Sequence, residues 1–330
     1  MDYTRATLSR RHVLTAGAAL AATACSPRGN AGIGGPRIWG PPAGPSIILA
    51  LAAQDGLLQQ AFPEASIAAW RSPDELRAGL TSGSMQISVM PLNTAANLYN
   101  RGQDIRLFNI MTRGLLYIVS DNEVLSDIPS LAGLRLAVPY RKDAPDIILR
   151  RLLDHHGLDP DSDLTVRATG SPVEATQLLL TGQVDAAFVP EPAVSAVIAA
   201  ASVMGRHLER KIDVQSAWQD IAGSDASLPQ AGLAVLGQFH DEHADEFSRF
   251  GPALVEATRR TLSSPGDAAH AAASTFHLPA PILEASIPHS NLVSVSATQA
   301  RDEVQAYFSA IHTLDTDILG GRLPDDGFYL

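Results

Sequence analysis

The chain has 330 residues, which is enough for two ordinary domains or one large one. Hydrophobic residues make up 45% of it and charged residues 18%, a composition that excludes an intrinsically disordered chain. The formal net charge is −11, from 24 Lys and Arg against 35 Asp and Glu, and this acidic balance argues against nucleic-acid binding, which needs clustered cations.

Residues 1–24 have the layout of an export signal, and the single cysteine, Cys25, follows them. A basic start precedes an apolar stretch that is too short to span a bilayer. Ser9–Leu14 resembles the twin-arginine export motif, and Ala22–Cys25 resembles a bacterial lipobox, in which the cysteine is lipidated. A plain N-terminal helix with an incidental cysteine is the alternative. We expect a twin-arginine-type lipoprotein signal peptide, a lipid anchor at Cys25 and a flexible tether at 25–36.

An internal repeat relates residues 72–91 to residues 171–190 at an offset of 99. Six positions are identical without a gap, and each residue type has a structural role. The two serines suit helix N-caps, the glutamates complete capping boxes, and the glycines suit left-handed C-caps. The identical pairs are Ser72 and Ser171, Pro73 and Pro172, Glu75 and Glu174, Leu80 and Leu179, Gly83 and Gly182, and Pro91 and Pro190.

The same offset extends upstream, so the chain contains two units of the pattern β-α-β-α-β-α. The expected strands are 37–40, 66–70 and 85–90 in the first unit, and 136–139, 165–169 and 184–189 in the second. Helices are expected at 45–58 and 144–156, and after each N-cap serine. Chance recurrence of capped βα units is the alternative. The alternation predicts two parallel sheets covered by helices on both faces, with ligands bound beyond the carboxyl ends of the strands.

The remaining segments complete the two units. Residues 105–111 and 115–121 are expected to be the last strand of one unit and a strand that crosses to the other. Residues 211–214 and 231–236 are expected to form the return crossing. Helices are predicted at 240–263, 265–276, 279–286 and 297–314, whereas the tail at 315–330 has turn signals and no clear assignment.

Several stretches resemble the extracytoplasmic solute-binding proteins of ABC importers. The closer likeness is to the nitrate/sulfonate/taurine branch with its thiamine-pyrimidine relatives. The resemblance covers residues 37–205 well and the C-terminal third poorly. The stretches are Pro91–Asn97 (PLNTAAN), Gly133–Pro139 (GLRLAVP) with Pro145 and Asp146 beyond it, Gly157–Pro160 (GLDP), and Glu174–Pro192.

The resemblance implies an α/β protein of the two-lobed type II periplasmic-binding fold, in which two pseudo-repeated βα lobes are joined by two hinge crossings. Lobe one is then expected at 37–118 and 226–330, and lobe two at 119–225. The implied function is that of a lipid-anchored substrate-binding component of an ABC transporter. Such a protein is a monomer on the periplasmic or cell-surface side that delivers a small solute to permease and ATPase subunits, without a cofactor, metal or nucleic acid.

Candidate ligand-binding residues lie where the predicted strands end, because helix N-termini at these points favour anionic groups. The run from Tyr140 to Lys142 adds a ring and two cations. We therefore expect a small anion such as a sulfonate or a nitrate-like compound, with a pyrimidine or other heterocycle as the alternative. Each candidate also has a structural alternative as a turn, a cap or a solvated charge. The candidates are Gly40, Pro41, Ser46, Arg71, Asn93, Thr94, Arg113, Tyr140, Arg141, Lys142 and Glu191.

Catalytic motifs were sought and are absent from the sequence. It contains no Gly-x-Ser-x-Gly, no P-loop and no Gly-x-Gly-x-x-Gly. His240 and His243 do not form a His-Glu-x-x-His pattern, so no metal site and no catalytic residue are expected. An enzyme of thiamine or menaquinone synthesis on the same fold and a ligand-binding sensory subunit remain the alternatives.

Overall fold

A computed structural model of the chain describes residues 35–223 and 226–330. The signal peptide predicted at 1–24, the lipid anchor at Cys25 and the tether as far as residue 34 lie outside the described residues. None of the helices in the described part combines the length and the apolar character that a membrane span requires.

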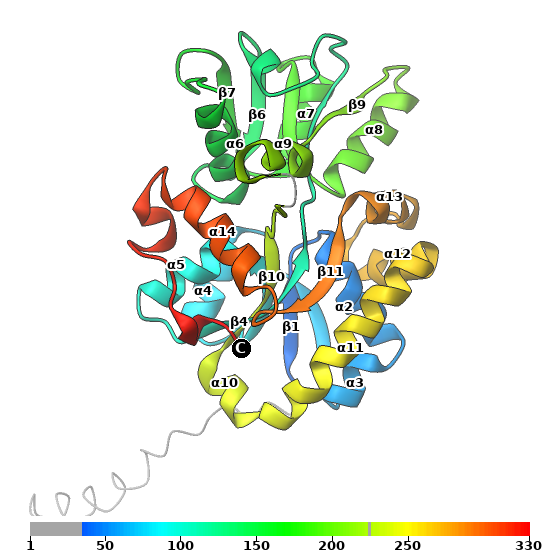
Figure 1. The fold of residues 1–330 in the computed structure, drawn as a ribbon. Helices are drawn as coiled ribbons and strands as arrows, with labels where there is room; N and C mark the ends of the chain where they lie inside the picture. Colours follow the sequence, from blue (N-terminus) through cyan, green and yellow to red (C-terminus); the bar gives the residue numbers. More distant parts are fainter. Residues whose placement is uncertain (1–34, 224–225) are drawn as a thin grey trace, which may run out of the picture. The chain divides into compact units, whose positions relative to one another are not determined.

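The first of two sheets has six strands in the order β2-β1-β3-β10-β4-β11 (Figure 1). Strands β1, β2 and β3 run parallel, whereas β10 runs antiparallel to both β3 and β4. The prediction of a parallel sheet therefore holds for β1, β2 and β3 and is wrong for the rest of the sheet, because the returning chain inserts β10 antiparallel to β3. The strands are β1 (Arg37–Gly40), β2 (Ser66–Ala69), β3 (Ile87–Pro91), β4 (Ile105–Thr112), β10 (Ala231–Leu236) and β11 (Leu292–Ser296).

The second sheet has five strands in the order β7-β6-β8-β5-β9. It repeats the plan of the first, with three parallel strands followed by an antiparallel strand that the chain contributes as it crosses. The chain passes between the sheets twice, from β4 to β5 and from β9 to β10, as expected. The strands are β5 (Leu116–Ser120), β6 (Arg135–Pro139), β7 (Thr165–Thr169), β8 (Ala186–Pro190) and β9 (Glu209–Asp213).

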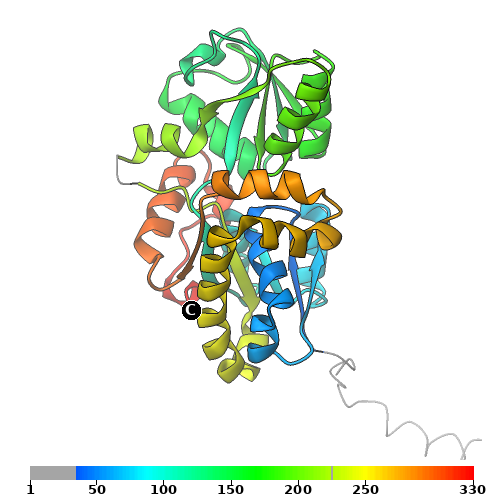
Figure 2. The same cartoon turned by 90° about the vertical axis from the view of Figure 1, so that its right-hand side faces the viewer.

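Helices cover both faces of each sheet. On one face of the first sheet, Figure 2 shows α2 (blue) beside α11 and α12 (yellow). We call the first sheet with its helices lobe one and the second sheet with its helices lobe two. The helices of lobe one are α2 (Gly44–Gln54), α3 (Leu57–Ala61), α4 (Pro73–Thr81), α5 (Leu92–Asn100), α10 (Gly237–Glu242), α11 (Ala244–Ser263), α12 (Pro265–Phe276), α13 (Ala280–Ser286) and α14 (Arg301–His312). Those of lobe two are α6 (Ala144–His155), α7 (Pro172–Leu180), α8 (Ala193–Val203) and α9 (Val214–Ala222).

The capping predicted from the repeat is present in both lobes. Ser72 accepts a hydrogen bond from the amide of Glu75, and Ser171 accepts one from the amide of Glu174, each at 3.2 Å. In a capping box the glutamate accepts from the amide of the N-cap residue itself. Here the carboxylates of Glu75 and Glu174 accept from the amides of the preceding residues, Arg71 and Gly170. Each cap therefore fixes the end of a strand as well as the start of the following helix.

The C-terminal part differs from prediction. The helix predicted at 240–263 is two helices, α10 and α11, which meet at His243. Residues 292–296 form the edge strand β11, and the tail that had no assignment is ordered. It contains two short 3₁₀ helices, η3 (Thr316–Leu319) and η4 (Asp326–Phe328). The ring of Phe328 is fully buried, and the amide of Leu330 donates to the Leu107 carbonyl oxygen at 3.0 Å, which ties the tail to β4.

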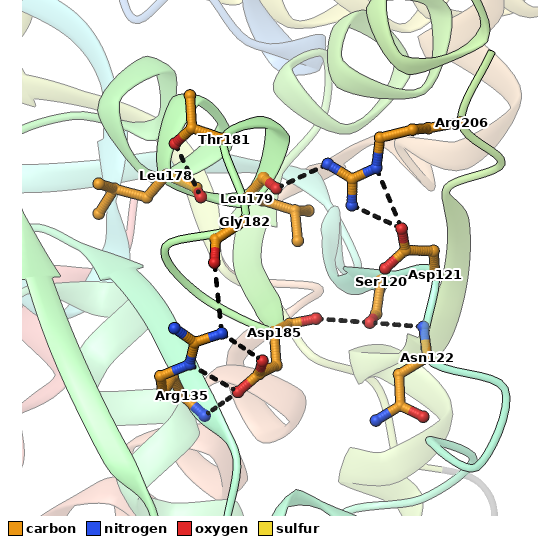
Figure 3. Close-up of polar contacts among 10 residues, drawn as sticks. All are labelled: Ser120, Asp121, Asn122, Arg135, Leu178, Leu179, Thr181, Gly182, Asp185 and Arg206. Carbon is orange, nitrogen blue, oxygen red and sulfur yellow. Dashed lines mark hydrogen bonds and ion pairs between the residues drawn. The ribbon is translucent and has the colours of Figure 1, made fainter. Parts of the chain in front are cut away.

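Arginines fix the edge of lobe two that carries the amino ends of β6 and β8 (Figure 3). Arg206 donates to the carbonyl oxygens of Leu179 and Leu180 and so caps the carboxyl end of α7. It also pairs with Asp121, while Arg135 pairs with Asp185. These cations are occupied with structural partners at the edge opposite the loops that follow β6 and β8.

Candidate ligand-binding site

Two helices of lobe one begin directly after neighbouring parallel strands and leave buried polar atoms without partners. Ser46 lies in the first turn of α2 after β1, and Asn93 lies in the first turn of α5 after β3. Their side chains are 1% and 4% exposed, yet Ser46 Oγ and Asn93 Oδ1 have no hydrogen-bond partner. Because buried polar atoms are nearly always paired in folded proteins, these two atoms are candidates for a ligand contact, although only Asn93 lines the cavity described below.

Gly40 allows α2 to begin close against the end of β1. A Cβ atom at this position would lie 2.3 Å from Ser46 Oγ, which is far closer than real atoms approach. The predicted contact residues Gly40 and Pro41 thus have a clear structural role as the turn that places Ser46 at the edge of the sheet.

A cavity of about 920 Å³ is walled by α5 from lobe one and α6 from lobe two. This volume lies within the usual range for small-molecule sites. Four of the predicted site residues line it: Asn93, Thr94, Arg141 and Lys142. The other lining residues are Arg77, Asn97, Leu98, Asp143, Asp146, Ile147, Arg150, Asp154, Gly157, Leu158, Asp159, Pro160, Leu314, Asp315, Asp317 and Ile318.

The loop between β6 and α6 is held in an unusual backbone conformation. Tyr140 and Lys142 have φ angles of 57° and 66°, in the left-handed region that non-glycine residues seldom adopt. The amide of Tyr140 donates to the Thr169 carbonyl oxygen, and the amide of Lys142 donates to Asp146 Oδ2 at 2.8 Å. Backbone strain of this kind concentrates at binding sites, where the surrounding bonds over-determine the loop.

Charges of both signs line the cavity, with six aspartates against four cations, and two of the four cations are paired. Arg77 pairs with Asp143 at 2.5 Å, and Arg150 pairs with Asp146 at 3.1 Å. Burial raises the pKa of Asp143, although Arg77 opposes this effect. Among the ion pairs of the described residues, none includes Arg141 or Lys142, so these two cations remain available to a ligand.

Seven of the predicted site residues are not among those that line the cavity: Gly40, Pro41, Ser46, Arg71, Arg113, Tyr140 and Glu191. Arg71 has an 87% exposed side chain and pairs with Glu75 at the start of α4. Arg113 forms a two-pronged pair with Glu303 of α14, with both N–O distances at 3.0 Å. Tyr140 lies in the same loop as Arg141 but is not among the residues that line the cavity, and burial raises the pKa of its hydroxyl.

Glu191, the remaining predicted residue, is fully buried at the start of α8. Its carboxylate accepts from the amide of Ser195 at 3.0 Å and from Nε of Arg210 at 2.9 Å. Burial raises the pKa of Glu191 and Arg210 opposes the rise. The guanidinium of Arg210 also lies over the ring of Tyr117, 5.6 Å from its centre. All of these contacts are within lobe two, so the geometry gives Glu191 a capping and pairing role.

Several cavity residues were missed by the sequence reasoning. Arg77 and Asn97 lie on helix faces, where a polar residue is ordinarily solvated, and nothing in the local pattern marks them. Asp315, Asp317 and Ile318 come from the tail that received no assignment, and they reach the cavity through contacts with α5. Only the three-dimensional arrangement brings these residues to the cavity wall.

The histidines weighed for metal binding have other neighbours. His240 pairs with Asp241, while His243 stacks on Phe239 with ring centres 4.1 Å apart. Across residues 35–223 and 226–330, no group of three His, Cys, Asp or Glu side chains is arranged to hold a metal ion.

Solved structures of similar fold come from several bacteria. An ABC transporter protein from Parabacteroides distasonis superposes with a TM-score of 0.73 at 23% identity, covering 89% of this chain and 98% of that one. The periplasmic aliphatic sulphonate binding protein SsuA from Escherichia coli gives 0.68 at 18% identity, covering 87% and 94%. The alkanesulfonate-binding protein SsuA from Xanthomonas axonopodis pv. citri, bound to MOPS, gives 0.64 at 20% identity, covering 86% and 95%.

The sequence itself matches one family. The model of the NMT1-like family matches residues 66–276, whereas a search of curated proteins found no match. The family match and the shared fold confirm the resemblance to the nitrate/sulfonate/taurine branch of solute-binding proteins and the two-lobed architecture expected from it. The chain therefore belongs to the NMT1-like family.

Proposed function

We propose that the protein is the substrate-binding component of an ABC transporter and that it holds a small solute in the cavity walled by α5 and α6. The observation that carries this proposal is that the cavity takes its walls from both lobes and borders the carboxyl ends of β3 and β6, where α5 and the loop before α6 begin. Ligands of open α/β sheets bind at these ends. The two crossings between the lobes supply a hinge about which the walls close on the solute.

The solute we propose is a small anion with a sulfonate or nitrate-like head group. Arg141 and Lys142 supply unpaired positive charge, and the first turn of α5 supplies amides and the buried side chain of Asn93. Two of the similar structures are named as sulfonate-binding proteins. The aspartates in the same wall disfavour a second negative charge, so a monoanion suits the cavity better than a dianion. A pyrimidine or other heterocycle is the alternative ligand.

The ligand class is tested by calorimetry and thermal shift with sulfonates, nitrate, pyrimidines and amino acids, since a solute that binds the folded state raises Tm. Arg141→Ala should weaken the binding of an anionic solute about tenfold, because it removes a charged partner. Arg167→Ala is the matched control, because Arg167 is an exposed arginine of lobe two outside the cavity lining. Equal affinity of the two variants would remove Arg141 from the site, and a lack of binding by any anion would overturn the proposed ligand class.

For cellular location, we propose export and attachment to the membrane through a lipid on Cys25, with delivery of the solute to a permease and its ATPase. The support is the sequence pattern around residues 9–25 together with the family. Cys25→Ser should move the protein from the membrane fraction to the soluble fraction of exported protein. A wild-type protein that is already in the soluble fraction would contradict the anchor.

A further inference from the structure

The C-terminal segment Asp315–Leu330 lies against α5, the helix that presents Asn93 and Thr94 to the cavity. The amide nitrogen Nδ2 of Asn97 donates to the carbonyl oxygens of Asp317 and Ile318, at 2.8 and 3.2 Å. One side chain of α5 therefore bonds to the segment while lining the cavity.

Asn100, at the other end of α5, binds the segment more fully. Its Nδ2 donates to the carbonyl oxygens of Leu319 and Arg322, at 2.6 and 2.7 Å, and its Oδ1 accepts from Arg322 Nε at 3.2 Å. Next to it, the Tyr99 hydroxyl donates to the carboxylate of Asp325. Asn100 does not line the cavity, so these contacts serve the placement of α5 rather than a ligand.

The segment is packed too closely against α5 to be a loose tail. Gly320 has a φ angle of 77°, and a Cβ atom there would lie 3.0 Å from the Asn97 carbonyl oxygen. Only glycine adopts this conformation readily and leaves the space for α5. At its far end the segment is fixed by the buried ring of Phe328 and by the bond from Leu330 to β4.

The segment also forms part of the cavity wall, through Asp315, Asp317 and Ile318. A helix of nine residues such as α5 is marginally stable by itself, so its position depends on tertiary contacts. We propose that the segment Asp315–Leu330 is a positioning element of the solute site, which holds the first turn of α5 in its binding orientation through Asn100. The part of this inference that concerns solute affinity rests on the proposed function of the cavity.

The test uses Asn100→Ala in the full chain, with Arg301→Gln as the matched control. Arg301 pairs with Asp326, so the control removes a contact of the same segment that does not involve α5. Hydrogen exchange is measured without any solute over residues 92–100. Asn100→Ala should speed exchange there about tenfold, while Arg301→Gln leaves it unchanged. Asn100→Asp loses both donors and places a carboxylate oxygen against the carbonyl oxygens of Leu319 and Arg322, so it should speed exchange at least as much as Asn100→Ala.

Affinity for MOPS and for nitrate provides the second measurement. If the wild type binds a probe, Asn100→Ala should weaken that binding about five- to tenfold. Its Tm should stay close to that of Arg301→Gln. The reason is that a displaced α5 loses contacts with the solute, whereas a general loss of stability leaves those contacts in place. Faster exchange confined to residues 315–330, or equal affinities of the two variants, would overturn the inference. A wild type that binds neither probe counts against the proposed anion, and hydrogen exchange alone then decides on the positioning of α5.

Discussion

Nη2 of Arg77 lies 2.5 Å from Oδ1 of Asp143, and this pair joins α4 of lobe one to the start of α6 in lobe two. Asp143 is the N-cap residue of α6 with extended backbone, yet its side chain accepts no bond from the helix. Arg77 also lies 3.6 Å from Asp74 within α4. Each partner thus has a local alternative when the lobes separate, because Asp143 can cap α6 and Arg77 can pair with Asp74.

We expect Arg77→Gln to favour the open arrangement of the lobes and to weaken solute binding about two- to fivefold, since a partly exposed pair contributes at most about 1 kcal/mol. The lobe separation is measured by electron paramagnetic resonance between spin labels at Val203 and Leu262, both exposed, in a Cys25→Ser background. Arg71→Gln is the control, because its pair with Glu75 lies within one lobe. Identical distance distributions in the two variants would contradict the expectation.

The buried pair of Glu191 and Arg210 gives a prediction about stability. Arg210→Met should destabilise the protein by about 3 kcal/mol at neutral pH, because it leaves a fully buried carboxylate without its counter-charge. The double variant Arg210→Met with Glu191→Gln should regain most of this loss, since it removes the buried charge as well. Urea unfolding at fixed pH measures the three proteins. A double variant as unstable as the single one would show that the loss comes from packing.

The same pair predicts a dependence on pH whose sign follows from the raised pKa of Glu191. A carboxyl with a folded-state pKa above its unfolded value keeps its proton longer in the folded protein, so its contribution to stability falls as the pH rises through that interval. Arg210→Met removes the positive charge that opposes this rise, so the folded-state pKa of Glu191 should move further above its unfolded value. The destabilisation by Arg210→Met should therefore be larger at pH 8 than at pH 5. An equal loss at both values would contradict this.

Local patterns in the sequence were sufficient to predict the repeated part of the fold. The serines Ser72 and Ser171 start their helices where predicted, and the repeat of strands and helices is present in both lobes. Arg141 and Lys142, which were chosen because they follow a predicted strand and are cations, line the cavity. In each case the signal comes from residues within a few positions of each other, where capping and strand–helix alternation act.

Contacts between distant residues were not predictable from such patterns. Arg77 and Asp143 are 66 residues apart, and Arg113 and Glu303 are 190 apart, so no local spacing links either pair. The position of β10 between β3 and β4 likewise depends on pairing between strands that are more than 100 residues apart in the sequence. The tail acquires its structure from α5 and β4, which lie more than 200 residues earlier.

The two N-cap serines allow a matched comparison between the lobes. Ser72→Ala and Ser171→Ala should each lower the free energy of unfolding by about 1 kcal/mol, as the loss of a cap does in other helices. The bond that Ser72 accepts is partly buried and the one that Ser171 accepts is exposed, so the loss should be the larger at Ser72. Urea unfolding of the two variants beside Ser72→Asp and Ser171→Asp, which retain a cap, measures the difference.

Asn93 gives the sharpest separation of binding from stability. Its buried Oδ1 has no partner, so Asn93→Ala removes an unsatisfied acceptor and should change the free energy of unfolding by less than about 1 kcal/mol without solute. If the side-chain amide nitrogen Nδ2 of Asn93 donates to the proposed anion, the same variant should lose about tenfold in affinity. Asn122→Ala is the control, because Asn122 lies at the far edge of lobe two, beside Asp121 (Figure 3). Calorimetric titration and urea unfolding measure both quantities. A variant that loses stability but binds as tightly as the control would place Asn93 in the core and move the solute elsewhere in the cavity.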